Sequence, residues 1–273
     1  MKVKRIPAMG LVSLLAALAM ALATAMAVAW VIARQPGRSG WTDVSWSYAV
    51  GLAGVAAALV SVGGGVGGRR LLVALLIGAW SLRLGTHILR RTLKGGDDAR
   101  YVNLRLEWGE DFSRRLLWFL QIQAAAGFVL MFSIVVAARN PAPFPAWSDW
   151  AGAVILLAST LGETIADRQL RAFAARAKDR QAVADCGLWG WSRHPNYFFE
   201  WLGWFAYAVI AIGPDGRFAW GWLALSGPAF IYWLLVHVSG IPPTEEHMLR
   251  SRGAKFRSYQ RRVNAFFPWP GRR

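Results

Sequence analysis

The sequence predicts an all-α polytopic membrane protein with seven transmembrane helices, and three observations lead to that prediction. Of the 273 residues, 55% are hydrophobic. Only 17% are charged, whereas a soluble domain usually carries about 25% charged residues. The hydrophobic residues gather in long runs, and the short segments between the runs hold most of the Lys and Arg, as in membrane spans and their connecting loops.

Seven apolar runs are candidates for membrane spans, each of which needs about 20 residues to cross a bilayer. They cover residues 7–33, 46–62, 71–89, 116–138, 147–166, 196–213 and 218–239. Trp and Tyr residues lie near many of their ends, as in the interfacial belts of membrane proteins. No polar linker is long enough to divide the chain, so we predict a single membrane domain over residues 1–273.

The basic residues predict the orientation of the chain. With seven spans the two termini lie on opposite sides, and 23 Lys and Arg fall on the C-terminal side against 7 on the N-terminal side. Because cytoplasmic loops carry the excess of Lys and Arg, we expect a cytoplasmic C-terminus and an N-terminus outside. We expect this multi-pass protein in the cell inner membrane.

Composition excludes several kinds of site. Cys186 is the only cysteine, so neither an intrachain disulfide nor a cysteine-based metal site is possible. The four histidines are too few for a histidine-rich di-iron membrane oxygenase, and we predict no metal. A net charge of +16 can indicate nucleic acid, anionic lipid or an anionic cofactor. Since the charges lie in loops between apolar runs, we attribute most of them to membrane sidedness and predict no nucleic-acid partner.

The segment Gly63–Gly68 matches the pattern G-x-G-x-x-G. That pattern binds dinucleotides only between the strand and the helix of a βαβ unit. Here it follows one predicted span and precedes Arg69 and Arg70. A flexible outer loop is the better interpretation.

Two of the predicted spans contain charged residues. Arg83 lies on the third span, where it either faces a cavity or extends to the membrane surface. On the fifth, Glu163, Asp167 and Arg171 are four residues apart and form one stripe on a helix. The stripe is either part of a site or an ordinary salt bridge at a solvated helix end.

Residues 187–200 hold the most informative pattern, Gly-Leu-Trp-Gly-Trp-Ser-Arg-His-Pro-Asn-Tyr-Phe-Phe-Glu. Pro195 suits the first turn of a helix, where its missing N–H costs nothing. The free amides of a helix N-terminus favour an anion. Arg193, two residues before Pro195, adds a cation whose forked guanidinium suits a phosphate. Asn196 and Glu200 then share one helix face. This arrangement indicates either a cofactor site or a structural helix cap.

The C-terminal part holds a third polar region. Thr244 is a candidate N-cap for a helix that carries Glu245 and Glu246 in its first turn. Residues 256–262 are basic, with interleaved aromatics. They form either an amphipathic helix on anionic lipid or a cytoplasmic wall over an anionic cofactor.

Together these segments resemble the membrane family of steroid 5-alpha-reductases and its bacterial relatives, from about residue 70 to the C-terminus. The motifs that carry the resemblance are Trp80-Ser-Leu-Arg83-Leu, Gly96-Asp-Asp-Ala-Arg100-Tyr101, Ala166-Asp-Arg-Gln-Leu-Arg171-Ala-Phe173, Leu188-Trp-Gly-Trp-Ser-Arg193-His194-Pro195-Asn196-Tyr197-Phe-Phe-Glu200 and Tyr259-Gln-Arg-Arg-Val-Asn-Ala-Phe-Phe-Pro268. The last two are the most specific.

The resemblance implies a function and a division of labour within the domain. Helices of about residues 1–140 would form a pocket for a hydrophobic steroid or lipid enone, and about residues 141–273 would bind NADPH from the cytoplasm. The implied reaction reduces a carbon–carbon double bond conjugated to a ketone, which would make the protein an oxidoreductase acting on CH–CH groups.

The expected NADPH site combines the matched positions with the polar residues around them. These are Asp167, Arg171, Arg193, His194, Asn196, Tyr197, Glu200, Glu246, Arg257 and Tyr259, with Arg83 and Arg100 by a looser alignment.

The sequence departs from the family pattern at two places. Phe199 stands where the family often has glycine. Steroid-reducing members polarise the ketone with a Tyr–Glu pair, but Trp80 falls near the tyrosine position and cannot donate an acidic proton. We therefore expect Asp43 or Tyr48 to act on the ketone oxygen, and Trp46 and Trp80 to line the substrate pocket.

Two other functions remain open. Isoprenylcysteine carboxyl methyltransferases, which use S-adenosylmethionine, also carry an Arg-His-Pro-x-Tyr motif and a Glu pair, and His194, Glu245 and Glu246 fit that pattern. The Ala166–Phe173 motif favours the reductase. A non-enzymatic lipid-binding or scaffold protein would explain the small-residue-rich first span but not the charged stripe.

Overall fold

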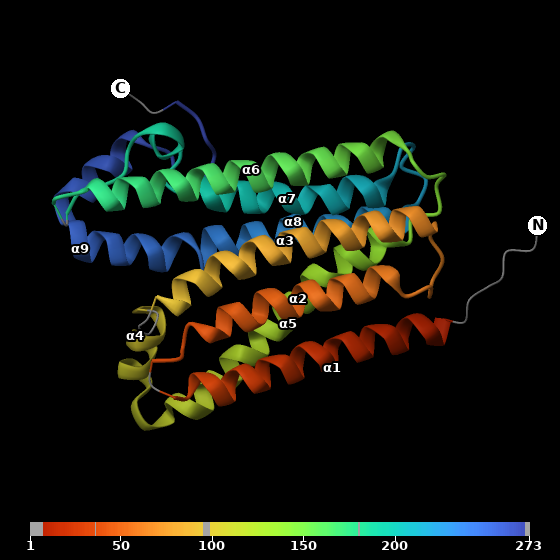
Figure 1. The fold of residues 1–273 in the computed structure, drawn as a ribbon, viewed down its shortest axis with the longest axis horizontal. Coiled ribbons are helices and arrows are strands. Elements are labelled where there is room, and N and C mark those ends of the chain that lie inside the picture. Colours follow the sequence, from red (N-terminus) through yellow and green to blue (C-terminus); the bar gives the residue numbers. More distant parts are fainter. Residues whose placement is uncertain (1–7, 36, 95–98, 180, 271–273) are drawn as a thin grey trace, which may run out of the picture. The chain divides into compact units, whose positions relative to one another are not determined.

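The computed structural model describes residues 8–35, 37–94, 99–179 and 181–270 (Figure 1). Within these ranges the regular elements are helices, with one isolated bridge between Ser192 and Asn264 and no strand. The predicted all-α class is confirmed. The predicted motif residues Gly96, Asp97 and Asp98 lie outside the described ranges.

The chain forms two compact units. Unit 1 comprises the residues up to Trp150 together with Tyr207–Ser226, and unit 2 comprises Ala151–Ala206 and Gly227–Arg273. The α-helices are α1 (Ala8–Ala33), α2 (Trp41–Leu59), α3 (Gly67–Leu93), α4 (Ala99–Trp108), α5 (Phe112–Ala138), α6 (Trp147–Arg176), α7 (Pro195–Ile212), α8 (Ser226–Trp233) and α9 (Ile241–Arg262).

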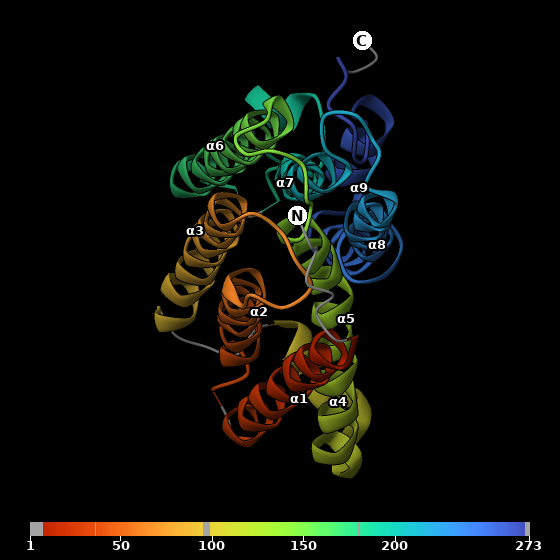
Figure 2. The same ribbon diagram turned by 90° about the vertical axis from the view of Figure 1, so that its right-hand side faces the viewer.

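Small residues bring α2 and α3 of unit 1 close together. A Cβ atom added to Gly51 would lie 2.0 Å from the Ser81 Oγ, and one added to Gly85 would lie 2.7 Å from the Tyr48 ring. Figures 1 and 2 both show α2 between α1 and α3. Close approach at glycine and alanine is the usual basis of helix packing in membranes, where hydrophobic burial between helices gives little.

Unit 2 uses the same device between α6 and α7. A Cβ atom on Gly162 would lie 2.3 Å from the Phe199 ring, and Ser159 donates a hydrogen bond to the Phe199 carbonyl at 2.7 Å. The Phe199 side chain, which the family resemblance marks as a departure, therefore fills the space that Gly162 leaves.

Among the residues that the structure describes, four stretches of helix are long and apolar enough to cross a membrane: Gly10–Ala33, Gly67–Leu93, Tyr101–Ala138 and Ala219–Arg262. The charged residues of the last stretch all lie in α9, after Gly240, so its apolar part precedes that helix. The chain is a membrane protein. Helices α2, α6 and α7 also overlap predicted spans, but the count of seven remains a prediction.

Two features of the helix ends differ from expectation. Thr244 is not an N-cap, because α9 begins at Ile241 with Gly240 before it and two prolines in its first turn. The segment predicted as the loop after the third span contains a further helix, α4. Pro195, in contrast, begins α7 as predicted.

Candidate functional site

Unit 2 contains a cavity of about 450 Å³. Its wall comes from the end of α6, the segment that follows it, the residues just before and within the first turn of α7, and α9. Small-molecule and cofactor sites usually measure about 300–1,000 Å³ and combine apolar walls with a few polar groups. This cavity has that character, since Phe173, Met248 and Phe256 line it beside Arg193, Asn196 and Arg252.

The C-terminal segment, residues 263–270, holds the chain in place before α7. The Arg193 amide donates a hydrogen bond to the Asn264 carbonyl at 2.8 Å, and the Ser192 hydroxyl donates one to the Phe266 carbonyl at 2.8 Å. The same hydroxyl accepts a hydrogen bond from the His194 amide at 3.1 Å. Residues about 70 positions apart along the chain thus fix one wall of the cavity.

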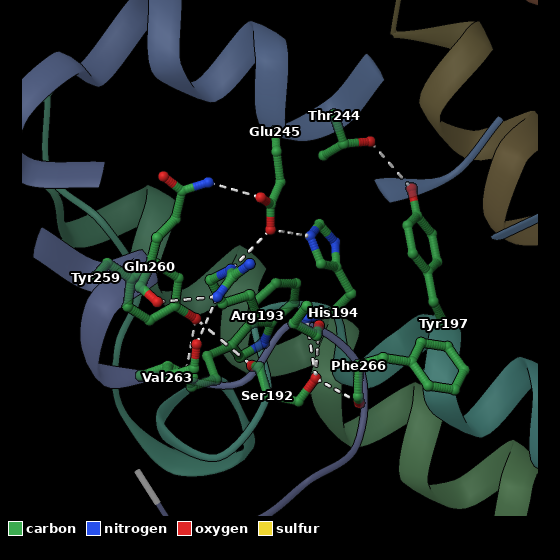
Figure 3. A network of polar contacts seen from close by, with 12 residues as sticks. Ser192, Arg193, His194, Tyr197, Thr244, Glu245, Tyr259, Gln260, Val263 and Phe266 are labelled. Carbon is green, nitrogen blue, oxygen red and sulfur yellow. Dashed lines mark hydrogen bonds and ion pairs between the residues drawn. The ribbon is translucent and has the colours of Figure 1, made fainter. Parts of the chain in front are cut away.

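Glu245 of α9 is the hub of a polar network beside the cavity (Figure 3). Its Oε1 accepts a hydrogen bond from the Arg193 Nε at 2.7 Å and contacts the His194 Nε2 at 3.1 Å. Its Oε2 accepts a hydrogen bond from the Gln260 side-chain amide at 2.7 Å. Arg193 also donates to the carbonyls of Gln260 and Val263. The network therefore ties the start of α7 to both ends of α9.

Burial and hydrogen bonding set the charges of this network. Burial lowers the pKa of His194 despite its contact with Glu245, which favours the neutral imidazole. Burial alone would raise the pKa of Glu245, but the hydrogen bonds from His194, Arg193 and Gln260 outweigh it and lower the pKa to about 2. The network at neutral pH is an ionised Glu245 paired with the Arg193 cation.

Two tyrosines complete the wall. The Tyr197 ring stacks on the His194 ring, with centroids 5.2 Å apart and planes 5° apart, and its hydroxyl lies 3.3 Å from the Thr244 hydroxyl. The Tyr259 hydroxyl is buried, donates a hydrogen bond to the Trp189 carbonyl at 2.6 Å, and has a pKa raised by that burial. Tyr259 is therefore a structural donor rather than a group ready to ionise.

Comparison with known proteins places the chain in a family. The profile described as "Protein of unknown function (DUF1295)" matches residues 29–263. The chain belongs to the DUF1295 family. The uncharacterized protein C594.04c of Schizosaccharomyces pombe is 26% identical over 239 residues, which cover 76% of this chain and 66%, just under two thirds, of that relative. No solved structure matches the chain significantly.

The structure brings five of the predicted cofactor residues of this DUF1295 protein to one cavity. They are Arg193, His194, Asn196, Tyr197 and Tyr259.

The other predicted cofactor residues of unit 2 do not line that cavity. Asp167 is buried in α6, whereas Arg171 and Arg257 are exposed. Glu200 accepts a hydrogen bond from the Trp204 indole at 3.0 Å, and Glu246 pairs on the surface with Arg250 at 2.6 Å.

The predicted catalytic and substrate residues lie in unit 1. The Tyr101 hydroxyl donates a hydrogen bond to Asp43 at 3.3 Å, and the Tyr48 hydroxyl lies 3.2 Å from that of Thr86. Asp43 and Tyr101 thus form a carboxylate–tyrosine pair.

The remaining predicted residues of unit 1 lie on α2, α3 and α4. The rings of Trp46 and Trp80 meet edge to face with centroids 6.4 Å apart, and Trp46 also donates to the Gln123 carbonyl at 2.9 Å. Arg83 lies half-buried on α3. The Arg100 side chain lies outside the described part of the chain.

Sequence reasoning missed part of the cavity wall. The segment after α6, including Ala182, Val183 and Ala184, carries no motif, and its place follows from α9, because Arg252 donates to the Ala182 carbonyl at 2.9 Å. The sequence gives Glu245 a functional role only in the methyltransferase alternative. The signals available in the sequence were the Arg193-His194 pair before α7 and a glutamate near the start of α9.

Within the described ranges, no group of three His, Cys, Asp or Glu side chains is placed to hold a metal ion.

Proposed function

We propose that this protein is an NADPH-dependent reductase of a carbon–carbon double bond conjugated to a ketone in a steroid or lipid-like substrate. One observation carries the proposal. Five residues of the expected NADPH site line a single cavity. They come from two segments of the chain that are more than 60 positions apart. A helix cap alone would not require an asparagine and two tyrosines to share a cavity with a cationic α9.

The residues present fit a dinucleotide. Asn196 offers an amide that suits the nicotinamide carboxamide or a ribose hydroxyl, and Tyr197 offers a ring for stacking. Arg252 lines the cavity, and its planar guanidinium suits a phosphate. Arg193 would shape the cavity wall rather than bind a phosphate, because its charge is already paired with Glu245. NADPH, when bound, supplies the hydride for the β-carbon.

The ketone oxygen needs a hydrogen-bond donor as negative charge develops on it. Asp43 and Tyr48 are the proposed groups. The Tyr101 hydroxyl donates its hydrogen bond to Asp43 in the structure, so it would serve the ketone only if it turned from Asp43 to the ketone oxygen. The α-carbon would then take its proton from solvent.

We further propose that the helices cross the inner membrane seven times, with the C-terminus in the cytoplasm. The cavity in unit 2 would then open to cytoplasmic NADPH, and the helices of about residues 1–140 would hold the hydrophobic substrate. The excess of Lys and Arg on the C-terminal side supports this orientation.

The test compares ligands and one matched pair of variants. The purified protein in detergent should be stabilised against heat by NADPH more than by NADH or S-adenosylmethionine. Asn196→Ala should weaken NADPH binding about tenfold, the equivalent of one hydrogen bond of roughly 1.4 kcal/mol. Arg217→Gln, in an exposed loop of unit 1, should leave the affinity unchanged. Equal NADPH affinity in wild type and Asn196→Ala would remove the basis of the proposal.

A methyltransferase is the second candidate, and the Glu245 network favours it. The Arg-His pair and the glutamate that this enzyme pattern shares are in direct contact here, at 2.7 and 3.1 Å. Stabilisation by S-adenosylmethionine alone, with methyl transfer to an isoprenylated cysteine carboxylate, would replace the reductase by this function.

A further inference from the structure

The glycine-rich connection between α2 and α3, residues Gly63–Gly68, has no role in the proposed reductase. Gly63, Gly64 and Gly65 all have positive φ angles, of 84°, 93° and 87°. Three such residues in a row are rare outside glycine. Gly63 and Gly64 are themselves exposed.

The connection leads into the N-terminus of α3, which has 27 residues. Its N-cap residue, Val66, makes no side-chain capping hydrogen bond, and the first amide bonded back along the helix is that of Arg70, to the Val66 carbonyl at 3.0 Å. The amides of Gly67 and Gly68 therefore point out of the helix end without intrahelical partners, where the helix dipole favours an anion.

Arg139, at the end of α5, is a second and independent feature of this place. Only 6% of it is exposed, and its Nη1 donates to the carbonyls of Ala57 and Val135 at 3.2 and 2.8 Å. Its Nε and Nη2 are buried and have no hydrogen-bond partner among the described residues. A buried charged donor without a partner is costly, and such groups usually mark an ion, a water or a ligand.

The Arg139 side chain lies directly beneath the glycine loop. A Cβ atom at Gly63 would lie 2.9 Å from the Arg139 Nε, and one at Gly65 would lie 2.2 Å from the Ala138 carbonyl oxygen. Only backbone without side chains can cover Arg139 this closely.

A second cation stands at the same helix end. Arg70 is half-buried, and one of its terminal nitrogens lies 4.0 Å from the position of a Cβ on Gly67. Burial and, secondarily, the charge of Arg70 lower the pKa of Arg139 to about 10. The neighbouring Arg69 is different, because Asp149 neutralises it with two hydrogen bonds. Within the described chain, neither Arg70 nor Arg139 forms an ion pair with a carboxylate.

We propose that the Gly63–Gly68 connection is a binding site for a phosphate group, held by the first amides of α3 between Arg70 and Arg139. A phosphate supplies the acceptor oxygens that Nε and Nη2 lack and relieves the repulsion between the two guanidinium groups. The site lies where α2 and α5 end and α3 begins, at the end of an apolar helix long enough to cross a membrane. A phospholipid headgroup is one source of such a phosphate, and a free phosphate ion is the other.

The experiment measures binding to the delipidated full-length protein in detergent by isothermal titration calorimetry. The probes are short-chain phosphatidylglycerol, inorganic phosphate, and a short-chain diacylglycerol that lacks the phosphate. We expect saturable binding of a phosphate-bearing probe and none of diacylglycerol. Binding of phosphatidylglycerol alone assigns the site to a lipid headgroup, and comparable binding of inorganic phosphate assigns it to a soluble anion.

Three variants test whether Arg70 and Arg139 hold the phosphate. Arg70→Gln and Arg139→Lys should each weaken binding about tenfold or more, as expected for a lost charge-assisted hydrogen bond. The control Arg114→Gln removes an exposed cation at the opposite end of α5 and should bind as wild type does. If Arg139→Lys does not fold, Arg70→Gln decides alone. The proposal is overturned if the wild type binds no phosphate probe, or if Arg70→Gln binds as tightly as wild type.

Discussion

Replacement of Glu245 by glutamine tests the network that shapes the candidate site. Glu245 is 13% exposed at its side chain and accepts hydrogen bonds from Arg193 and Gln260. Glutamine keeps an oxygen for Arg193, but it sets an NH₂ group against the NH₂ group of Gln260 and removes the countercharge of Arg193. Breaking a buried pair by removing one partner is strongly destabilising.

The pKa of Glu245 gives the size of the effect. It lies at about 2 against an ordinary value of 4.5, and each pKa unit is worth about 1.4 kcal/mol. The ionised carboxylate therefore contributes roughly 3 kcal/mol to the free energy of unfolding at pH 7. Because the folded pKa is depressed, this stability is fully present above pH 4.5 and is lost as the pH falls toward 2. At pH 3 less than half of it should remain.

The assay is unfolding in mixed micelles of a mild detergent and dodecyl sulfate, followed by tryptophan fluorescence at pH 7 and pH 3. Glu245→Gln should lose about 3 kcal/mol at pH 7, and its difference from wild type should shrink at pH 3. The matched control is Glu246→Gln, whose exposed pair with Arg250 contributes no more than about 1 kcal/mol. A difference that is the same at both pH values, or equal losses in the two variants, would refute the reasoning.

Two further substitutions probe buried contacts, each by the same unfolding measurement. Arg69→Met should destabilise unit 1 by about 3–5 kcal/mol, because it leaves the buried Asp149 without its cation. The double variant Arg69→Met/Asp149→Leu should recover part of that loss. If the loss in the double variant equals the sum of the losses in the two single variants, the two residues do not stabilise each other. Tyr259→Phe should cost about 1–3 kcal/mol, because it leaves the buried Trp189 carbonyl without its donor; wild-type stability would show that the hydrogen bond contributes nothing.

The correct predictions, the all-α class and the start of α7, depend only on interactions between residues close together in the sequence. Long apolar runs must be helices in a bilayer, because only helices satisfy every backbone group within one segment. The all-α class follows from this without any knowledge of contacts. Pro195 begins α7 for an equally local reason, since a proline in the first turn gives up no hydrogen bond.

The same local rule misplaced the start of α9. Thr244 has the side chain of a good N-cap, but Pro242 and Pro243 already suit the first turn of a helix, and α9 begins before them at Ile241. The preference of threonine for the N-cap position made Thr244 a candidate for the start of this helix, but the two prolines set the start further upstream. The Thr244 hydroxyl meets Tyr197 instead.

The cavity could be predicted only in part, because its wall depends on contacts between distant segments. The pattern before α7 identified Arg193 and Asn196, and both line the cavity. What it could not give was the partner of Arg193. A forked cation before a helix N-terminus predicts an anion, and the family resemblance implies that this anion belongs to the cofactor. The structure supplies a carboxylate from the chain itself, Glu245. Any phosphate in this cavity must therefore rely on a cation other than Arg193, and Arg252, on the cavity wall, is the residue to which that role falls.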